Sequence, residues 1–388
     1  MRICIVSLNI IPYFHGPDVS RSGEGRAETG SPAGALARYG GAEVQAALLA
    51  DAFAEAGATV QFVVSDLENG CELPHAAQNA FYSKRGLPGL RFFHPRTAGI
   101  LSALARADAD VYFQHCAGSV TGLTAWFCKR HRRVFVYYAG SDSDFSFRTA
   151  RLGNMRDKMI FFWGLKNAGG IVAQNEYQAK LCRERLHREP CVIPSAVAAD
   201  AVPRTGKDGS IAWVGTLRAV KRPELFLELA RSLPERKFVL IGGAMGAEME
   251  YSRRIIEMAA TMPNVVATGR IPRQQVEEYL AGASLLVNTS RVEGFPNAFL
   301  EAWKHATPVL SMVDVDDLIR KERVGAVCGD IREMADCIEK LLADDETRAE
   351  MGRRARRLVE ERYAASVLAR KYLSYFGELL ASERGRAR

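Results

Sequence analysis

Short apolar runs alternate along the chain with longer segments in which apolar residues recur every three or four positions. Apolar runs of this length predict buried strands, and the helical spacing predicts amphipathic helices. One such helix covers residues 41–57 and ends at Gly57, a residue typical of helix C-termini. The first half contains six predicted strands: 3–8, 59–65, 111–115, 133–139, 170–174 and 191–195. This alternation favours a parallel sheet with helices on both faces.

The pattern starts again after a connector at 196–210, which is rich in Ala, Pro, Gly and charged residues and predicts a linker. A chain of 388 residues is too long for one ordinary domain. Further strands are predicted at 210–216, 237–243, 265–269, 285–290 and 308–312, with helices between them and two or three more helices in 333–384.

We therefore predict an α/β protein with two Rossmann-like, doubly wound domains, at residues 1–200 and 205–365. The C-terminal helix, 368–384, is expected to complete the first domain. Two such sheets joined by a hinge leave a cleft where the carboxyl ends of their strands face each other, and doubly wound sheets bind ligands at those ends.

The charge of the chain is modestly basic, with a net charge of +7 and a pI of about 9.0. Basic residues gather at 129–133, 148–158 and 353–357. They form solvated helix faces, or they attract phosphate-bearing ligands or an anionic membrane surface. Segment 159–168 ("MIFFWGLKNA") has two interpretations, core packing or an aromatic helix that faces a membrane. Nucleic acid is not an expected partner, because no binding module accompanies the charge.

The eight cysteines include no C-x-x-C pair, which predicts reduced thiols in a cytoplasmic protein. The first apolar run, in "MRICIVSL", is too short for a signal peptide. No apolar stretch reaches the roughly 18 residues that a membrane span needs. We expect a soluble protein, or one attached peripherally to the inner membrane face.

Residues 9–39 interrupt the strand–helix rhythm with a long segment rich in glycine and serine. A long loop beside a cleft is usually functional. The loop leads to Gly40 and Gly41 at the start of a helix. Paired glycines there allow the backbone to approach an anion closely, and the plain alternative is a tight turn.

Segment 291–303, "RVEGFPNAFLEAW", follows the strand predicted at 285–290 and so lies at a carboxyl end of the second sheet. Pro296 suits the first position of a helix, where its missing N–H costs nothing. The free N–H groups near Ala298 and Phe299 are then expected to point into the cleft as phosphate donors.

Two glutamates flank this turn. Glu293 in the loop is placed to accept hydrogen bonds from sugar hydroxyls, and Glu301 inside the helix is placed to accept both cis-hydroxyls of a ribose. The simpler alternative is that acids near a helix N-terminus are favoured by the helix dipole. Cations for a nearby diphosphate are available in "VGTLRAVKRPE", namely Arg218, Lys221 and Arg222, unless these only form a basic loop.

These segments, together with 40–60, "VIPSAV" at 192–197 and 362–380, resemble a family 4 retaining glycosyltransferase of the GT-B fold over nearly the whole chain. The E-x7-E spacing from Glu293 to Glu301 is the most specific feature. The resemblance implies a nucleotide-diphosphate sugar donor held mainly by the second domain, and no metal or other cofactor. It also implies an acceptor, a glycan or a lipid-linked saccharide, that the first domain selects.

The same resemblance assigns roles to individual residues. Lys221 would bind the diphosphate and Glu301 the ribose, while Gly40 and Gly41 would close on the donor from the first domain. The remaining donor contacts would come from Glu293, from the backbone of Gly294, Phe295, Pro296 and Asn297, and from the backbone around Gly242, Gly243, Arg270 and Ile271.

Two positions depart from the family pattern. Thr216 stands where an arginine is common, and Arg218 is expected to supply the charge from two residues further on. Ala139 stands where many members have a histidine near the donor sugar. His115, which ends a neighbouring strand, either lines the cleft or is structural.

Asp142 and Asp144 are candidates to contact acceptor or donor hydroxyls. An Asp-x-Asp pair also holds metal in single-domain glycosyltransferases, but the two-domain layout argues against that role here. Two other functions remain open, a sugar-nucleotide epimerase or phosphorylase of the same fold and a non-catalytic sugar-nucleotide-binding protein.

Overall fold

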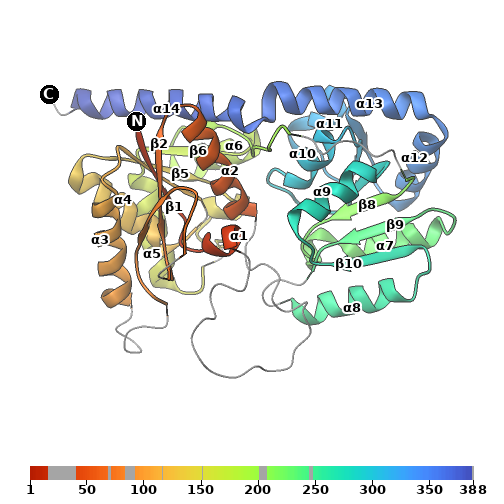
Figure 1. Cartoon of the computed structure of the whole chain (residues 1–388), viewed down its shortest axis with the longest axis horizontal. Helices are drawn as coiled ribbons and strands as arrows, with labels where there is room; N and C mark the ends of the chain where they lie inside the picture. Colours follow the sequence, from red (N-terminus) through yellow and green to blue (C-terminus); the bar gives the residue numbers. More distant parts are fainter. Residues whose placement is uncertain are drawn as a thin grey trace. The chain divides into compact units, whose positions relative to one another are not determined.

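The computed structural model describes residues 1–15, 41–68, 71–83, 92–115, 117–150, 152–200, 208–243 and 248–386, and divides them into two compact units (Figure 1). Unit 1 comprises the described residues up to Ala196 together with those from Ala365 onward. Unit 2 is Val197–Ala364. Gly40 and most of the predicted loop 9–39 lie outside the described residues.

Unit 1 is built on a seven-stranded sheet in the order β3-β2-β1-β4-β5-β6-β7, in which every pairing is parallel. The order reverses direction between β1 and β4, the switch point of a doubly wound sheet. All five residues of β5 are buried, as expected when helices cover both faces. The strands are β1 Arg2–Val6, β2 Thr59–Val64, β3 Ala76–Asn79, β4 Val111–His115, β5 Val134–Tyr138, β6 Gly170–Ala173 and β7 Cys191–Val192.

The helices of unit 1 form two layers. Helices α2 and α14 pack on one face of the sheet, where Phe53 meets Tyr372 and Phe376 at ring distances of 5.7 and 5.8 Å. Figure 1 shows α14 (blue) beside α2 (orange-red), so the C-terminal helix belongs to the N-terminal unit. Side chains of α3, α4, α5 and α6 fill the other face. The helices are α1 Ile11–His15, α2 Gly41–Glu55, η3 Phe92–Thr97, α3 Ala98–Ala107, α4 Ser119–His131, η4 Asp142–Phe145, α5 Met155–Asn167, α6 Glu176–Leu186 and α14 Ala365–Arg386.

Unit 2 repeats the plan with six parallel strands in the order β10-β9-β8-β11-β12-β13. Its switch point lies between β8 and β11. The strands are β8 Ile211–Val214, β9 Phe238–Ile241, β10 Val265–Gly269, β11 Leu285–Asn288, β12 Val309–Ser311 and β13 Gly325–Val327. The helices are η5 Ala219–Lys221, α7 Pro223–Ser232, α8 Met249–Ala260, α9 Arg273–Gly282, α10 Asn297–Lys304, η6 Val315–Asp317, α11 Leu318–Glu322, α12 Ile331–Ala343, α13 Asp345–Leu358 and η7 Val359–Tyr363.

The predicted fold class, two Rossmann-like doubly wound α/β sheets, is confirmed. Each sheet has its own switch point, so each sheet offers a place for a ligand at the carboxyl ends of its strands. Among the helices of the described ranges, none is both long enough and apolar enough to cross a bilayer.

Candidate active site

A lysine–glutamate pair lies at the switch point of unit 2. Lys221 ends the turn η5 that follows β8, and Glu293 lies in the loop that follows β11. The Lys221 Nζ is 2.6 Å from Oε1 and 2.7 Å from Oε2 of Glu293. The Glu293 side chain is only 7% exposed and that of Lys221 26%. Both residues follow strand ends, as predicted, and the structure also brings them into direct contact, which was not predicted.

The Glu293 carboxylate is held by more than the lysine. Its Oε1 also accepts hydrogen bonds from Asn288 Nδ2 at 3.1 Å and from Ser290 Oγ at 2.6 Å. Asn288 is the last residue of β11, and Ser290 lies two residues beyond it. A carboxylate fixed by three donors needs little reorganisation when a ligand arrives, which is the condition for strong electrostatic stabilisation.

The loops after β8 and β11 are tied together by Thr289 and Arg222. The Thr289 hydroxyl accepts a hydrogen bond from Trp213 Nε1 at 3.1 Å and lies 2.9 Å from the Lys221 carbonyl. The Arg222 Nε donates to the Thr289 carbonyl at 2.7 Å. Arg222, one of the three predicted cations, is thus engaged by the backbone and adopts a left-handed conformation with φ of 49°. Arg222 therefore ties the loop that carries Lys221 to the segment that follows β11.

Arg218 lies in the same loop but pairs with an acid that the sequence did not single out. Its Nε is 3.3 Å from Glu248 Oε1, and Glu248 Oε2 accepts the Ala219 N–H at 2.7 Å. Glu248 immediately precedes α8, and Ser252 of that helix donates to the Leu217 carbonyl at 2.7 Å. Thr216 precedes this stretch and is partly buried. Arg218 was predicted to supply positive charge to a bound diphosphate. In this structure its charge is balanced by Glu248.

Glu301 belongs to a second charged cluster, inside α10. Its side chain is 16% exposed, and its Oε1 is 3.7 Å from Arg273 Nη2. Burial raises the pKa of the Glu301 carboxyl, while the charges of Arg273 and Lys304 oppose that rise. Lys304, whose side chain is 1% exposed, donates to Glu277 at 2.8 Å, and Arg273 Nε is 3.4 Å from the same oxygen. This network was not predicted, although its members lie at helical spacing in the sequence of α9 and of α10.

The start of α10 differs from the prediction in two details. The helix begins at Asn297, so Pro296 is the residue before it rather than its first residue. The Phe299 N–H donates to the Pro296 carbonyl at 3.0 Å. The prediction that this N–H is free to bind phosphate is therefore wrong. The Phe295 ring packs on Tyr363 at 5.3 Å. Its side chain is therefore committed to packing.

Glycines allow neighbouring backbone segments to approach closely where β8, β9 and β10 end. A Cβ on Gly242 would lie 1.7 Å from the Gly215 carbonyl oxygen, and its φ of 146° excludes other residues. A Cβ on Gly243 would lie 3.2 Å from that of Arg270. Gly243, Arg270 and the adjacent Ile271 are thus brought together at this edge. Ile271 leads into α9, whose Arg273 contacts Glu301.

In unit 1, His115 ends β4 and stacks on Tyr138 with ring centroids 4.3 Å apart and planes 20° apart. The Phe113 ring meets its edge at 5.0 Å. Burial lowers the pKa of His115 to about 3, so the ring is neutral at physiological pH. Its Nε2 is buried and has no hydrogen-bond partner within the described part of the chain. These contacts favour the structural alternative for His115.

The two candidate aspartates of unit 1 are engaged by the protein. Asp144 Oδ2 accepts hydrogen bonds from the Tyr137 hydroxyl, Gly140 N–H and Ser141 N–H at 2.9, 2.9 and 3.2 Å. Asp142 Oδ1 accepts one from Gln178 at 3.0 Å, and burial raises its pKa. Within the described ranges, no group of three or more His, Cys, Asp or Glu side chains is placed to hold a metal ion.

Asp144 should make stability depend on pH. Burial raises its pKa to about 6, whereas an unfolded aspartate titrates near 3.9. Between these values the folded protein holds a proton that the unfolded chain has lost, so stability falls as pH rises through this window. We expect the unfolding free energy of the wild type, relative to Asp144→Asn, to fall by about 2 kcal/mol between about pH 4 and pH 7. Urea unfolding of both proteins across this range tests it, and parallel pH profiles would contradict it.

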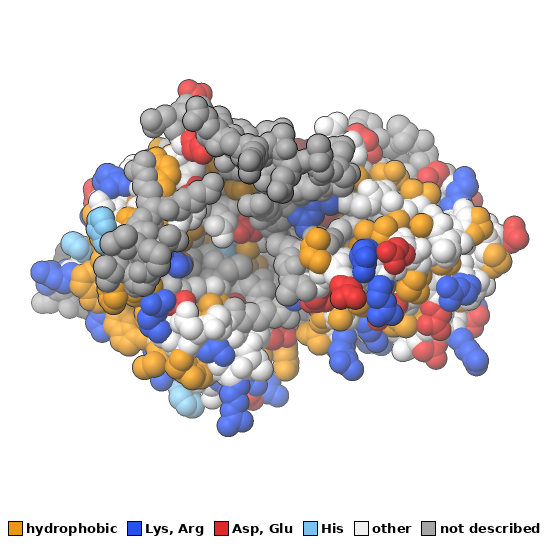
Figure 2. Space-filling view, turned by 90° about the horizontal axis from the view of Figure 1, so that it is seen from below, with side chains coloured by type: hydrophobic (Ala, Val, Ile, Leu, Met, Phe, Trp, Pro, Cys, Tyr) orange, Lys and Arg blue, Asp and Glu red, His pale blue; other side chains and the backbone are white. Residues whose placement is uncertain are grey.

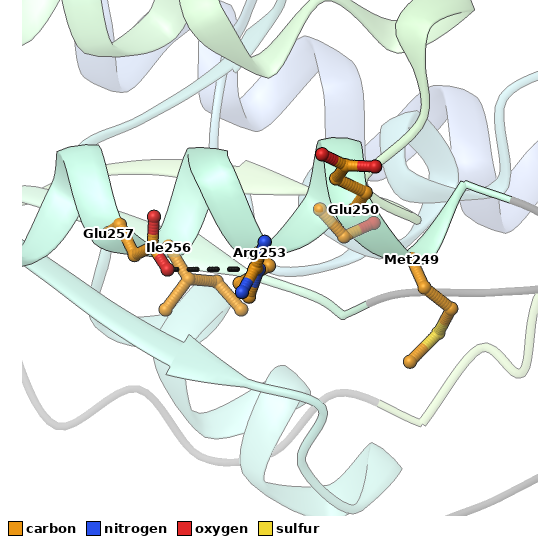
Figure 3. Close-up of a pocket in the computed structure, with 6 residues that line it drawn as sticks. Met249, Glu250, Arg253, Ile256 and Glu257 are labelled. Carbon is orange, nitrogen blue, oxygen red and sulfur yellow. Dashed lines mark ion pairs between the residues drawn. The ribbon is translucent and has the colours of Figure 1, made fainter.

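A separate pocket of about 550 Å³ lies along α8 (Figure 3). Its lining comes from one helix, and Arg253 and Glu257 form an ion pair of 3.8 Å there. None of the predicted site residues lines it. The lining residues are Met249, Glu250, Ser252, Arg253, Ile256 and Glu257.

Two family models match this chain. Residues 39–201 match glycosyltransferase family 4, and residues 208–344 match glycosyl transferases group 1. The two matches together span most of both units. The chain therefore belongs to the family 4 glycosyltransferases with the GT-B fold, and the predicted family is confirmed.

Two curated relatives are similar in sequence. D-inositol 3-phosphate glycosyltransferase of Gordonia bronchialis is 26% identical over 297 residues, which cover 67% of this chain and 65% of the relative. Alpha-D-kanosaminyltransferase of Streptomyces kanamyceticus is 27% identical over 221 residues, 52% of this chain and 56% of the relative. In each case the match spans less than two thirds of the relative's length.

Solved structures resemble the whole chain. Sucrose-phosphate synthase from Thermosynechococcus elongatus superposes with a TM-score of 0.71 at 18% identity, covering 98% of this chain and 100% of the other. Anabaena HepE in complex with UDP-glucose gives a TM-score of 0.71 at 14% identity, with coverage of 98% and 100%. At these identities the likeness establishes the fold.

Proposed function

We propose that this protein is a metal-independent, retaining glycosyltransferase that moves a hexose-type sugar from a nucleotide-diphosphate sugar to a glycan or lipid-linked saccharide. The observation that carries the proposal is the Glu293 carboxylate, fixed by Lys221, Asn288 and Ser290 at the switch point of unit 2. Family membership supports the reaction class, and this geometry supports the site.

Lys221 is proposed to bind the donor diphosphate while it still contacts Glu293. An ammonium has three donors, so it can serve a phosphate oxygen and a carboxylate together. The positive charge then stabilises the diphosphate as it leaves. Arg218 would add charge if phosphate replaces Glu248 as its partner. The acceptor hydroxyl oxygen bonds to the anomeric carbon on the face from which the diphosphate departs, its proton passes to the departing phosphate oxygen, and the configuration is retained.

Glu293 is proposed to bind hydroxyls of the transferred sugar, and Glu301 those of the ribose. A carboxylate can accept two cis-hydroxyls only when it is ionised, and burial opposes ionisation of Glu301. The charges of Arg273 and Lys304 oppose this effect of burial, and the pKa of Glu301 still lies above its ordinary value. Backbone groups near Gly243, Arg270 and Ile271 are proposed to hold the base.

The relatives suggest which ligands to try first. HepE was solved with UDP-glucose, and TarM of S. aureus with UDP and α-GlcNAc-glycerol. The curated relatives are named for transfer involving D-inositol 3-phosphate and for kanosaminyl transfer. These names favour a UDP-sugar as the first donor and polar hydroxylated acceptors. The cysteines of the described ranges are free thiols, which suits the proposed cytoplasmic location.

A thermal-shift screen of UDP-, GDP- and ADP-sugars tests the donor site. A ligand at about 100 times its Kd stabilises the folded state by about 2.7 kcal/mol. For a unit of this size, that corresponds to an increase in Tm of roughly 5 °C or more. We expect one nucleotide series to raise Tm well above the others, and to do so without added metal. If none of the nucleotides raises Tm, the proposed donor site is wrong.

A binding protein without catalytic activity is the second candidate, and one observation favours it. Ala139, at the position where a histidine is common in the family, is buried and offers no side chain to a sugar; its N–H donates to the Val172 carbonyl at 2.9 Å. Under this alternative the protein binds the nucleotide sugar but transfers nothing. Sugar transfer by the wild type to any acceptor would exclude it.

A further inference from the structure

Helix α5 of unit 1 has an apolar stripe that faces solvent. Met155, Met159 and Trp163 follow one another at four-residue spacing and are 62%, 62% and 42% exposed. The opposite side of the helix, with Phe161 and Leu165, is fully buried in the core. Core packing, one of the two interpretations of segment 159–168, therefore applies to one side of the helix, and the other side is exposed. Large apolar side chains that are exposed together mark interaction sites, whereas single exposed apolar side chains are normal.

Neighbouring segments extend this stripe. Helices α4 and α5 meet tightly, since a Cβ on Gly164 would lie 2.7 Å from the Gly122 nitrogen. Further along both helices, Lys129 Nζ donates to Asn167 Oδ1 at 3.0 Å. Trp126, 49% exposed, lies between Gly122 and Lys129 on α4, beside the part of α5 that carries Trp163.

One more aromatic residue reaches the stripe from the segment before α5. Phe147 is 40% exposed, and its ring lies 5.3 Å from that of Phe162. We name the whole set the α4–α5 surface: Trp126, Phe147, Met155, Met159 and Trp163.

Basic residues surround the α4–α5 surface. Lys158 Nζ lies 6.0 Å from the centre of the Phe147 ring. The one acid within α5, Asp157, is 3.2 Å from Arg156 Nη2, and α4 contains no acid at all. Figure 2 shows hydrophobic side chains (orange) exposed beside Lys and Arg side chains (blue) on one face of unit 1. The basic residues of the two helices and of the segment before α5 are Lys129, Arg130, Arg148, Arg156, Lys158 and Lys166.

We propose that the α4–α5 surface docks the protein onto an anionic lipid bilayer. Tryptophan and methionine would enter the interface between headgroups and acyl chains, where amphipathic aromatic side chains are favoured. The surrounding Lys and Arg would lie against lipid phosphates, which attract each of them by about 1 kcal/mol. This docking is independent of which nucleotide sugar unit 2 binds.

The charge pattern favours a membrane over a protein partner. A second copy of the chain would bring two basic surfaces together, and like charges across an interface cost several kcal/mol. The cores of protein interfaces are also poor in lysine. An anionic bilayer complements both the charge and the scattered, protruding apolar side chains.

Co-sedimentation with vesicles tests the proposal. We expect the full-length protein to sediment with phosphatidylcholine–phosphatidylglycerol vesicles at low salt, to be released by high salt, and to remain free with phosphatidylcholine alone. Met159→Ser combined with Trp163→Ser should lower the partition coefficient at least about tenfold. Lys158→Gln combined with Lys166→Gln should lower it roughly thirtyfold.

The chain offers matched controls on α8. Met249 is 62% exposed, like Met159, and Arg253 is 69% exposed. Met249→Ser and Arg253→Gln should leave vesicle binding unchanged, and thermal melts should show that all variants are folded. The proposal is wrong if the wild type ignores anionic vesicles, or if the controls lose as much binding as the test variants. It is equally wrong if sedimentation velocity reveals a dimer that the Met159 and Trp163 substitutions dissociate.

Discussion

Replacing Glu293 with glutamine is expected to lower kcat for sugar transfer by roughly 10²–10³-fold, the effect of removing one preorganised electrostatic group. Glutamine keeps the shape of the side chain but lacks the charge that faces Lys221 and accepts hydrogen bonds from Asn288 and Ser290. Affinity for the nucleoside diphosphate should be nearly unchanged, because Glu293 is assigned to the sugar. Single-turnover transfer with the preferred donor measures the rate, and calorimetry measures the affinity.

The matched control for this experiment is Glu360→Gln, a 49% exposed glutamate in unit 2 that pairs with Arg356. It should transfer sugar at the wild-type rate. If Glu293→Gln retains wild-type kcat, Glu293 has no catalytic role. If transfer and nucleotide binding disappear together while the thermal melt is intact, the division of roles between the two glutamates is wrong.

Replacing Lys221 with methionine is expected to weaken both catalysis and folding. Transfer should fall by roughly 10²–10³-fold, because the departing diphosphate loses its cation. Removing one partner of a buried ion pair lowers the unfolding free energy by about 3–5 kcal/mol. Because the Lys221 side chain is 26% exposed, we expect a smaller decrease, about 2 kcal/mol. Urea unfolding and kinetic assays measure the two effects separately.

The double variant Lys221→Met/Glu293→Gln separates the effect on stability from the effect on transfer. It removes both charges, so it should regain most of the lost stability and none of the lost transfer activity. Lys321→Met, in an exposed pair with Asp317, serves as the control and should change neither property. Wild-type transfer by Lys221→Met would rule out its contact with the diphosphate.

Much of the fold could be predicted because buried parallel strands have a simple sequence pattern. Strand β5 is fully buried and appears in the sequence as a continuous apolar run, VFVYY. Strand β4 is nearly fully buried and begins with the apolar run VYF, followed by Gln114 and His115. Two edge strands were missed. β3 reads "AAQN" and β13 reads "GAV", and both are short, only partly buried and weak in β-branched residues.

The site could be predicted only as far as local sequence determines it. Glu293 and Lys221 were placed at strand ends, but their contact joins residues 72 positions apart. It depends on β8 and β11 being neighbours, which no local pattern specifies. Glu248 was missed for the same reason, because its ion pair with Arg218 depends on where α8 begins. Two helical spacings could have indicated the charged cluster around Glu301: Arg273 and Glu277 lie four residues apart on α9, and Glu301 and Lys304 lie three residues apart on α10.

The exposed face of α5 shows a different limit. An apolar helix segment was recognised, but periodicity alone could not say which apolar residues face the core. Gly122 and Gly164 decide this, because their close contact fixes how α5 is rotated against α4. Trp163, adjacent to Gly164, is left on the outside.

The two glutamates of the proposed site are assigned to different parts of the donor: Glu293 binds the transferred sugar, and Glu301 binds the ribose. Isothermal titration tests this assignment most directly, using the preferred nucleoside diphosphate and its 2′,3′-dideoxy analogue with the wild type and with Glu301→Gln. We expect the wild type to bind the ribose form at least about tenfold more tightly than the dideoxy form, and Glu301→Gln to bind both equally weakly. Equal binding of the two nucleotides by the wild type, or full discrimination by Glu301→Gln, would contradict the assignment.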